Sequence, residues 1–296
     1  MNKGLVYVLS AYIFWGLHPI YWKLLKHISP TIIVSHRIIW SFLFFCVIII
    51  IKNQWKTLIT KVRNSNNKKM IFLPAFLIGA NWLTYIWAVN TGYIIETSLG
   101  YFICPLIIVL LGVLFLEESL RKMQWFAVSL AIIGVLIMTF VYGQFPWVAL
   151  FLAGTWGFYV FLRKASPLNS LEGLTLETAL LSIPAAIYLL FYNTAGSDYL
   201  VNDNYSFILL MVTGIISGLP LLFFINGSRQ IKLSLIGILQ YIYPTIVFII
   251  GAFIYGEELS LAKMAGFAFI WLALLIYSSE TLILKMIKKI EVVNEQ

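Results

Sequence analysis

Charged residues are scarce in this sequence: they make up 11% of the chain, while 61% of its residues are hydrophobic. This balance lies far outside that of soluble globular proteins and indicates a membrane protein. Cysteine is rarer still, with only Cys46 and Cys104, and both fall within long apolar runs. A disulfide framework is therefore not expected.

Motifs for nucleotide hydrolysis and for metal binding are also missing. The sequence contains no Gly-x-x-x-x-Gly-Lys-Ser/Thr loop, so the chain is not expected to hydrolyse nucleotides. Its three histidines all fall in the first 36 residues and form no His-Glu-x-x-His pair. We therefore expect no cofactor, no metal site and no catalytic residues.

Long apolar segments are what the sequence has in abundance. A segment of roughly 20 apolar residues crosses a bilayer, because ~1.5 Å of rise per residue covers about 30 Å of hydrocarbon. Such segments must be helical, since lipid offers no hydrogen bonds to backbone groups. The predicted fold is an all-α integral membrane protein with ten transmembrane helices, near residues 4–25, 31–51, 70–90, 95–116, 123–141, 146–162, 174–193, 206–227, 233–255 and 264–284.

An internal repeat organises these segments. Residues 81–120 recur as residues 220–259, an offset of 139 positions at which Pro105 corresponds to Pro244. The earlier spans repeat with slight drift, since Trp15-Gly16 and Lys23 precede Trp156-Gly157 and Lys164 by 141 positions. A period this long in so apolar a chain indicates a duplicated membrane unit.

The repeat predicts two halves of five helices each, residues 1–142 and residues 143–296 with a short cytoplasmic tail. Five spans is an odd number, so the second half is inverted relative to the first. Inverted repeats are typical of secondary transporters, in which the substrate site lies between the halves near the membrane midplane. Two nearly equivalent halves give inward-open and outward-open states of similar energy.

Basic residues are distributed unevenly over the predicted loops. With the N-terminus in the cytoplasm, sixteen lysines and arginines fall on the inner side and three, Lys23, Lys26 and Lys263, on the outer side. This asymmetry follows the positive-inside rule and places both termini in the cytoplasm. Basic loops beside anionic lipid explain the net charge of +8, so no nucleic-acid partner is expected. The expected partners are a small-molecule substrate and membrane lipid, and monomer and homodimer both stay open.

Short motifs along almost the whole chain carry a family resemblance. They are Trp15-Gly16-Leu17-His18-Pro19, His36-Arg37-Ile38, Asn81-Trp82, Trp87-Ala88-Val89-Asn90, Gly100-Tyr101-Phe102, Gln240-Tyr241-Ile242 and Phe269-Ile270-Trp271. With them the chain resembles the drug/metabolite transporter superfamily, EamA type, and most closely the RarD-like proteins. The resemblance implies ten helices in an inverted five-plus-five repeat and small-molecule transport across the bacterial cytoplasmic membrane.

One loop departs from the family's pattern. Leu116-Glu117-Glu118 follows the fourth span, where the family's motif favours Gly-Glu. Glu118 and its repeat counterpart Glu257 are expected to hold amides at helix starts near the membrane ends.

Charged side chains inside the spans are the first candidates for a site, because a charge at a helix centre costs at least ~2.5 kcal/mol unless it faces a cavity or a partner. Arg37 lies six residues into the second predicted span, about 9 Å below the outer surface. With Lys23, His36 and Glu96 it is predicted to form a mostly basic cluster that opens outward. Two interpretations stay open: contact with an anionic group of the substrate, or a structural ion pair between Arg37 and Glu96. Glu177, near the inner end of the seventh span, is the other carboxylate that could take part in an ion pair or in coupling.

Aromatic and amide side chains form a second group of candidates, on spans that the resemblance puts around a central cavity. Tyr101 and Gln240 correspond at the 139 offset and lie about one turn before Pro105 and Pro244. A proline within a span frees a backbone carbonyl and bends the helix, so both prolines are predicted hinges. The remaining candidates for substrate binding are Trp15, Asn81, Trp82, Tyr85, Asn90 and Tyr241. Core packing is the alternative for the aromatic residues, and interhelical hydrogen bonding is the alternative for the two asparagines.

These features predict a secondary transporter of small organic molecules, with export the expected direction and uptake the alternative direction. A basic vestibule beside aromatic rings suggests a substrate with an apolar or aromatic body and an anionic group. The rival class is a membrane-embedded enzyme that acts on a lipid headgroup and uses His36 and Glu96 as acid and base. The repeat argues against that class, because catalysis does not need two pseudo-symmetric halves.

The predicted orientation has a direct test. A cysteine introduced at Asn204 should react with a membrane-impermeant thiol reagent in intact cells, because residue 204 follows an outer loop. A cysteine introduced at Asn66 should be protected until the cells are opened. The reverse labelling pattern would overturn the orientation.

Overall fold

The structure is a computed structural model that describes residues 2–194, 204–256 and 261–294. These residues form twelve α-helices and one short π-helix, and no strand occurs among them. The helices are α1 (Lys3–Leu24), α2 (Pro30–Ile51), α3 (Trp55–Asn64), α4 (Lys69–Asn90), α5 (Ile94–Phe115), α6 (Lys122–Tyr142), α7 (Trp147–Ala165), α8 (Ser170–Thr194), α9 (Asn204–Ser228), α10 (Leu233–Gln240), α11 (Ile242–Ile249), η1 (Ile250–Ile254) and α12 (Leu261–Asn294).

Eight segments are long and apolar enough to cross a membrane. They are α1, α2, α4, α5, α6, most of α8, α9, and Leu233–Ile254, which combines α10, α11 and η1. Each of the two other predicted spans also coincides with a helix. Of these, α7 carries Arg163 and Lys164 in its last turn, and the apolar part of α12, Met264–Glu280, is shorter than the eight.

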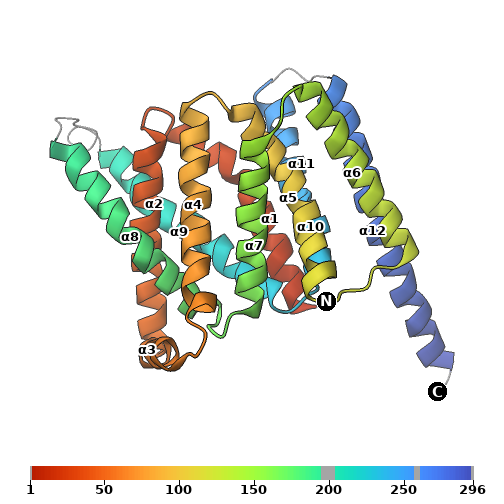
Figure 1. Cartoon of the computed structure of the whole chain (residues 1–296), viewed down its shortest axis with the longest axis horizontal. Coiled ribbons are helices and arrows are strands. Elements are labelled where there is room, and N and C mark those ends of the chain that lie inside the picture. Colours follow the sequence, from red (N-terminus) through yellow and green to blue (C-terminus); the bar gives the residue numbers. More distant parts are fainter. Residues whose placement is uncertain (1, 195–203, 257–260, 295–296) are drawn as a thin grey trace.

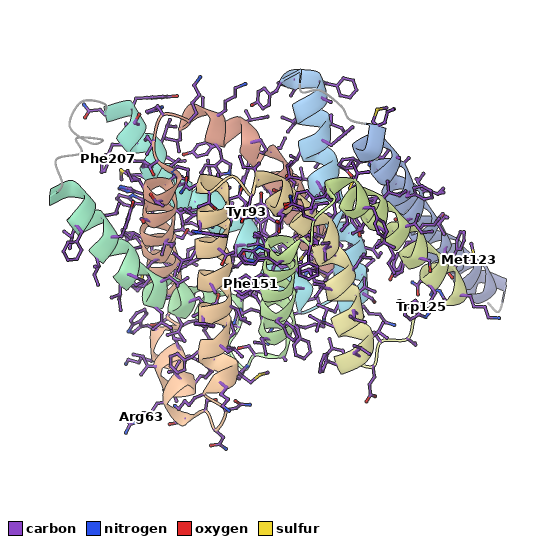
Figure 2. The ribbon with its side chains drawn as sticks, turned by 45° about the horizontal axis from the view of Figure 1, so that its top comes forward. Arg63, Tyr93, Met123, Trp125, Phe151 and Phe207 are labelled. Carbon is purple, nitrogen blue, oxygen red and sulfur yellow. The ribbon has the colours of Figure 1, made fainter. Side chains whose placement is uncertain are left out.

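Large apolar side chains cover the outward faces of the bundle. Met123 and Trp125 on α6, Phe151 on α7 and Phe207 on α9 are exposed and project from the surface of the ribbon (Figure 2). Exposed apolar surface of this extent is costly in water and favourable in lipid. The all-helical membrane class predicted from composition is confirmed.

The helices run from one end of the bundle to the other (Figure 1). The start of α1, the end of α12 and the short helix α3 lie at the same end, as the predicted placement of both termini on one side requires. At one edge α8 leans away from the bundle, and at the other α6 and α12 form a separate pair.

Helix contacts can be compared between the two predicted halves. Among the most extensive interfaces are those of α5 with α7, α6 with α12, α2 with α8, and α10 with α5. The contact between α4 and α7 has its counterpart between α9 and α1 when the two halves are exchanged. Likewise, the contact between α5 and α7 corresponds to that of α10 and α11 with α1.

Residues that correspond in the two halves meet at the centre of the bundle. The Tyr241 hydroxyl donates a hydrogen bond of 3.1 Å to the carbonyl oxygen of Phe102, which is 139 residues earlier in the chain. The rings of Trp15 and Trp156, which correspond at the 141 offset, lie 5.7 Å apart between centroids. Both contacts therefore join residues that correspond in the sequence repeat.

The central crossing requires a glycine. A Cβ on Gly237 of α10 would lie 2.5 Å from the carbonyl oxygen of Pro105 on α5, which is closer than real Cβ contacts allow. The bare backbone therefore lets α10 pack directly against α5. This close approach sets the spacing of the two helices that carry the central prolines.

The loop after α5, where Leu116-Glu117-Glu118 departs from the family's motif, has unusual backbone geometry. Glu117 has φ of 51°, in the left-handed region, directly after the C-cap of α5. Its counterpart at the 139 offset is Gly256, which has φ of 65°. Helices often end with a left-handed residue at this position, and glycine is favoured there because it has no Cβ. The same backbone conformation thus recurs in both halves. Glu117 adopts it although its Cβ makes a positive φ unfavourable.

Glu117→Gly should therefore stabilise the protein by about 1 kcal/mol, because glycine adopts a positive φ without the Cβ clash. Gly256→Ala should destabilise it by a similar amount, for the converse reason. Thermal unfolding in detergent measures both changes. A lower melting temperature for Glu117→Gly would show that the glutamate side chain contributes more than its backbone strain costs.

Candidate functional site

Arg37 on α2 lies against Trp82 on α4 in a cation–π contact. Its guanidinium carbon is 4.3 Å from the centroid of the indole ring. The Nε atom of Arg37 is buried and has no hydrogen-bond partner among the described residues. A buried N–H donor without a partner is costly, so an acceptor supplied by a ligand would satisfy it.

A row of three tyrosines adjoins this arginine. The Tyr101 ring lies 6.4 Å from the Tyr85 ring and 5.2 Å from the Tyr243 ring, measured between centroids. Tyr85 and Tyr101 lie near enough to Arg37 for an electrostatic interaction with its guanidinium. Tyr85 is 37% exposed, whereas Tyr101 and Tyr243 are half-buried.

We call these five residues the central site: Arg37, Trp82, Tyr85, Tyr101 and Tyr243. They come from α2, α4, α5 and α11, so both halves of the chain contribute. The arrangement provides one cation with free donor capacity, several hydroxyl groups and aromatic faces. It can therefore bind a molecule that has an anionic group and an apolar or aromatic body.

Gln240 lies on α10, beside the central site. Its side-chain oxygen is buried and has no hydrogen-bond partner among the described residues. The helix is interrupted at Tyr241, between α10 and α11, three residues before Pro244. By contrast, α5 continues through Pro105 without interruption. The two predicted hinges thus differ in this structure, because only the second half has a break in the helix beside its proline.

Two members of the predicted outward-opening cluster have separate partners. The Nζ atom of Lys23 lies 3.5 Å from the centroid of the Tyr255 ring. The Nδ1 atom of His36 accepts a hydrogen bond of 3.3 Å from the indole of Trp40, one turn along the same helix.

Glu96 binds both ends of the loop that connects the two halves. It accepts hydrogen bonds from the Tyr142 hydroxyl at 2.7 Å and from the backbone N–H of Val148 at 2.8 Å. Tyr142 ends α6 and Val148 is in the first turn of α7, so one carboxylate on α5 holds both. The structure therefore contains no Arg37–Glu96 ion pair among its described residues, because these two donors satisfy the carboxylate.

The other carboxylate of interest, Glu177, is in a buried ion pair. Its Oε1 atom lies 3.1 Å from Nε of Arg163, and its Oε2 atom accepts a hydrogen bond of 2.9 Å from Tyr159. The arginine and glutamate side chains are 1% and 3% exposed. Removing one partner of such a pair is strongly destabilising, so Glu177 is structural in this arrangement.

The remaining candidates make packing contacts or interhelical hydrogen bonds, with one exception. Trp15 lies against Trp156, and Tyr241 is fully buried. The side-chain amide of Asn81 donates to the carbonyl oxygen of Leu152 at 2.8 Å and to the Thr155 hydroxyl at 2.9 Å, which joins α4 to α7. Asn90, the exception, is exposed at the end of α4.

A second polar cluster ties the helices together at the end where α3 lies, and we call it the inner lock. Lys164, at the end of α7, donates to the carbonyl oxygens of Ser228 at 2.8 Å and Ile231 at 2.5 Å. Glu118 accepts hydrogen bonds from the backbone N–H groups of Leu233 at 2.6 Å and Ser234 at 2.8 Å. The expectation that Glu118 holds helix-start amides is therefore confirmed, while Glu257 lies outside the described residues.

Two further contacts join helices near the inner lock. The Tyr12 hydroxyl on α1 donates to the carbonyl oxygen of Ile236 on α10 at 3.1 Å. Gly227, near the end of α9, packs so closely on α1 that a Cβ there would lie 2.6 Å from the carbonyl oxygen of Gly4. Helices α1, α7, α9 and α10 are therefore joined at this end by charge-assisted and backbone contacts.

Two residues were not predicted from the sequence as site residues: Tyr243 of the central site and Lys164 of the inner lock. Tyr243 has a signal in the sequence, because it immediately precedes Pro244 and corresponds to Cys104 at the 139 offset. Lys164 was identified only as the counterpart of Lys23. Its carbonyl partners come from the end of another helix, and no residue spacing in the sequence indicates them.

Comparison with known proteins places the chain in a family. The profile of the EamA-like transporter family matches residues 2–140 and 146–279. The uncharacterized transporter YojE of Bacillus subtilis is 44% identical, over 94% of this chain and 94% of its own length. Protein RarD of Escherichia coli is 41% identical, over 93% of this chain and 94% of its own, and the chloramphenicol-sensitive protein RarD of Pseudomonas aeruginosa is 30% identical over 93% of each. A crystal structure with 16% sequence identity has a TM-score of 0.70, over 93% of this chain and 97% of the other, and shows that the fold is shared.

The fold and the central site define a multi-pass helical membrane protein with a polar centre between its helices. The chain belongs to the EamA-like transporter family and, within it, is similar to the RarD proteins over most of its length. It is thus a membrane transporter of small molecules.

Proposed function

We propose that this protein is a secondary transporter that works by alternating access between two inverted halves, residues 1–142 and 143–296, with ten transmembrane helices and both termini in the cytoplasm. Support comes from the family profile, which matches twice and divides the chain close to that boundary. Further support comes from the contacts at the centre between residues that correspond in the two halves. Export is the proposed direction.

The proposed substrate has an anionic group and an apolar or aromatic body. The observation that carries this proposal is Arg37, whose buried Nε has no hydrogen-bond partner within residues 2–194, 204–256 and 261–294, while its guanidinium lies against Trp82. A carboxylate could accept from the guanidinium in the fork geometry that arginine provides, and the aromatic side chains would contact the rest of the molecule. The same arginine without a substrate leaves a donor unsatisfied at the centre of the bundle.

The geometry gives no support to the rival enzyme class. That class needs His36 and Glu96 close together as acid and base. His36 bonds to Trp40, whereas Glu96 holds Tyr142 and the start of α7. Transport is therefore the function that the arrangement favours.

The alternating step would use the two corresponding lysines in turn. Lys164 holds the end of α9 in the inner lock, whereas Lys23 lies over an aromatic ring instead of binding helix-end carbonyls. In the opposite state of an inverted repeat, the two halves exchange their conformations. Lys23 would then bind carbonyls at the outer end, and the contacts of Lys164 would open.

Arg37→Ala should lower export by at least about tenfold while the protein still folds, because the anionic group loses its charged partner. Arg37→Lys should restore little activity, since an ammonium lacks the planar fork. The measurement is efflux of anionic aromatic metabolites from proteoliposomes loaded with a bacterial metabolite extract, followed by mass spectrometry. Chemically unchanged compounds in the external medium also separate transport from catalysis.

Glu96→Gln is the control for a structural role of Arg37. Were the two residues an ion pair in the working protein, each single variant would unfold at a lower temperature and the double variant would recover. We expect instead that Arg37→Ala leaves the melting temperature in detergent nearly unchanged. A double variant that is stable and fully active would show that Arg37 does not bind substrate.

Lys164→Met should favour the inward-open state, because two charge-assisted hydrogen bonds of the inner lock are lost. Cys104 is 3% exposed and belongs to the same hydrophobic cluster as Tyr12 and Ile236, so its reaction with a maleimide reports opening of that packing. In a Cys46→Ser background, where Cys104 is the only thiol, labelling should become at least about tenfold faster. Lys23→Met should slow it.

Lys232→Met is the matched control, since this exposed lysine lies directly before α10. Its labelling rate should equal that of the Cys46→Ser parent. Equal rates for the Lys164 and Lys232 variants would mean that the carbonyl contacts of Lys164 do not hold this end closed.

A further inference from the structure

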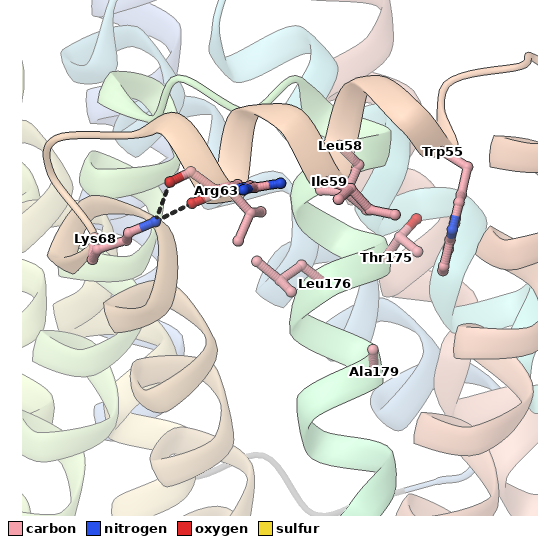
Figure 3. Close-up of a pocket in the computed structure, with 9 residues that line it drawn as sticks. Trp55, Leu58, Ile59, Arg63, Lys68, Thr175, Leu176 and Ala179 are labelled. Carbon is pink, nitrogen blue, oxygen red and sulfur yellow. Dashed lines mark hydrogen bonds between the residues drawn. The ribbon is translucent and has the colours of Figure 1, made fainter.

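A cavity of about 330 Å³ lies between the short helix α3 and the N-terminal half of α8, away from the central site (Figure 3). One wall is the apolar stripe of α3, in which Trp55, Leu58, Ile59 and Val62 recur at helical spacing. The facing wall includes Leu176 and Ala179 of α8. Leu58 and Ile59 point from α3 toward Leu176 (Figure 3). The space is therefore lined almost entirely by apolar groups.

The rim of this cavity is basic. Residues 52–69 contain six lysines and arginines and no acidic residue. Arg63 and Lys68 line the cavity mouth. Lys68 donates to the backbone carbonyl oxygens of Val62 and Arg63 at the end of α3, as Figure 3 shows.

Two of the cations near the rim are already engaged, but Arg63 is not. Lys61 forms an ion pair of 2.8 Å with Glu172, and Lys68 holds the end of α3. Within the described part of the chain, the guanidinium of Arg63 has neither a hydrogen bond nor an ion pair, and its side chain is exposed. The guanidinium of Arg63 could therefore donate hydrogen bonds to an anion at the mouth of the cavity.

The position of α3 relates this cavity to the lipid surface. The helix connects α2 and α4 at one end of the bundle, so it lies at the level where spans leave the membrane (Figure 1). Trp55 is 41% exposed, and tryptophan is enriched at the boundary between headgroups and hydrocarbon. A helix with one apolar face, and with lysines and arginines beside it, is typical of a membrane interface that contains anionic lipid.

We propose that the cavity between α3 and α8 is a binding site for an anionic phospholipid, with an acyl chain between the apolar walls and the headgroup phosphate against Arg63. The charge of the rim favours an anionic lipid over a zwitterionic lipid and over an apolar peptide. The assignment of this lipid to the cytoplasmic leaflet rests on the proposed orientation of the transporter. Binding itself does not depend on orientation or on transport.

Bound lipid would stabilise α3 and thereby the link between two functional helices. The helix α3 connects α2, which carries Arg37, to α4, which carries Trp82. A lipid that fills the space beneath α3 would fix the ends of both helices at this side of the membrane. Lipid composition would then act on the helices of the central site.

Native mass spectrometry of delipidated protein can test the site with two probes, phosphatidylglycerol and phosphatidylcholine. We expect phosphatidylglycerol to bind more tightly to the wild-type protein, and inorganic phosphate at the same concentration not to displace it. Arg63→Gln should weaken phosphatidylglycerol binding by about fivefold, the contribution of one basic residue near an anionic surface. Ala179→Leu should weaken both lipids, because its side chain occupies the acyl-chain space.

Lys69→Gln is the matched control, because it removes one charge from the same segment at an exposed position that does not line the cavity. It should leave phosphatidylglycerol binding unchanged. Equal losses for Arg63→Gln and Lys69→Gln would show attraction to diffuse charge and would overturn the site. Equal binding of the two lipids to the wild type, or unchanged binding to a folded Ala179→Leu variant, would overturn it as well.

Discussion

Polar groups inside a bilayer must find their partners within the protein, and this constraint explains most of the structure. It makes each span a helix, because only a helix satisfies its own backbone. It also decides which charged side chains are structural. Arg163 and Glu177 satisfy each other in a buried pair, and Glu96 is satisfied by Tyr142 and the start of α7. Arg37 is different, since its buried Nε has no hydrogen-bond partner in the described part of the chain, and that difference defines the central site.

The same constraint applies at the ends of the helices. A helix end leaves carbonyl or amide groups without intrahelical partners, so a charged side chain that reaches them joins one helix to another. Lys164 and Glu118 do this where α9 ends and α10 begins. Such contacts are strong when formed and can be exchanged for equivalent contacts elsewhere. In the proposed alternating-access cycle, corresponding residues of the other half would supply those equivalents at the opposite end of the molecule.

The repeat also explains local features that one half alone would leave unexplained. Glu117 has a left-handed backbone that a glycine would adopt with less strain, and its counterpart in the other half is a glycine, Gly256. The backbone conformation is therefore common to both halves, while the residue type differs. Asymmetry of this kind extends to the prolines, since the helix is broken beside Pro244 and continuous through Pro105. Two halves with the same plan need not hold the same conformation at the same time.

The sequence by itself determined the membrane class, the positions of the long apolar helices and the internal recurrence, because apolar length and recurrence are local or additive properties. The cost of a buried charge also made Arg37 a candidate for substrate binding, and that role stays a prediction. The sequence also predicted the role of Glu118 at a helix start. The sequence could not predict that Glu96 holds the connection between the halves, that Lys164 binds the end of α9, or that Tyr243 joins Tyr101. Each of these contacts joins residues at least about forty positions apart. Only the tertiary structure decided them, because the partner of a buried polar group depends on which helices pack together, and no spacing along the chain specifies that.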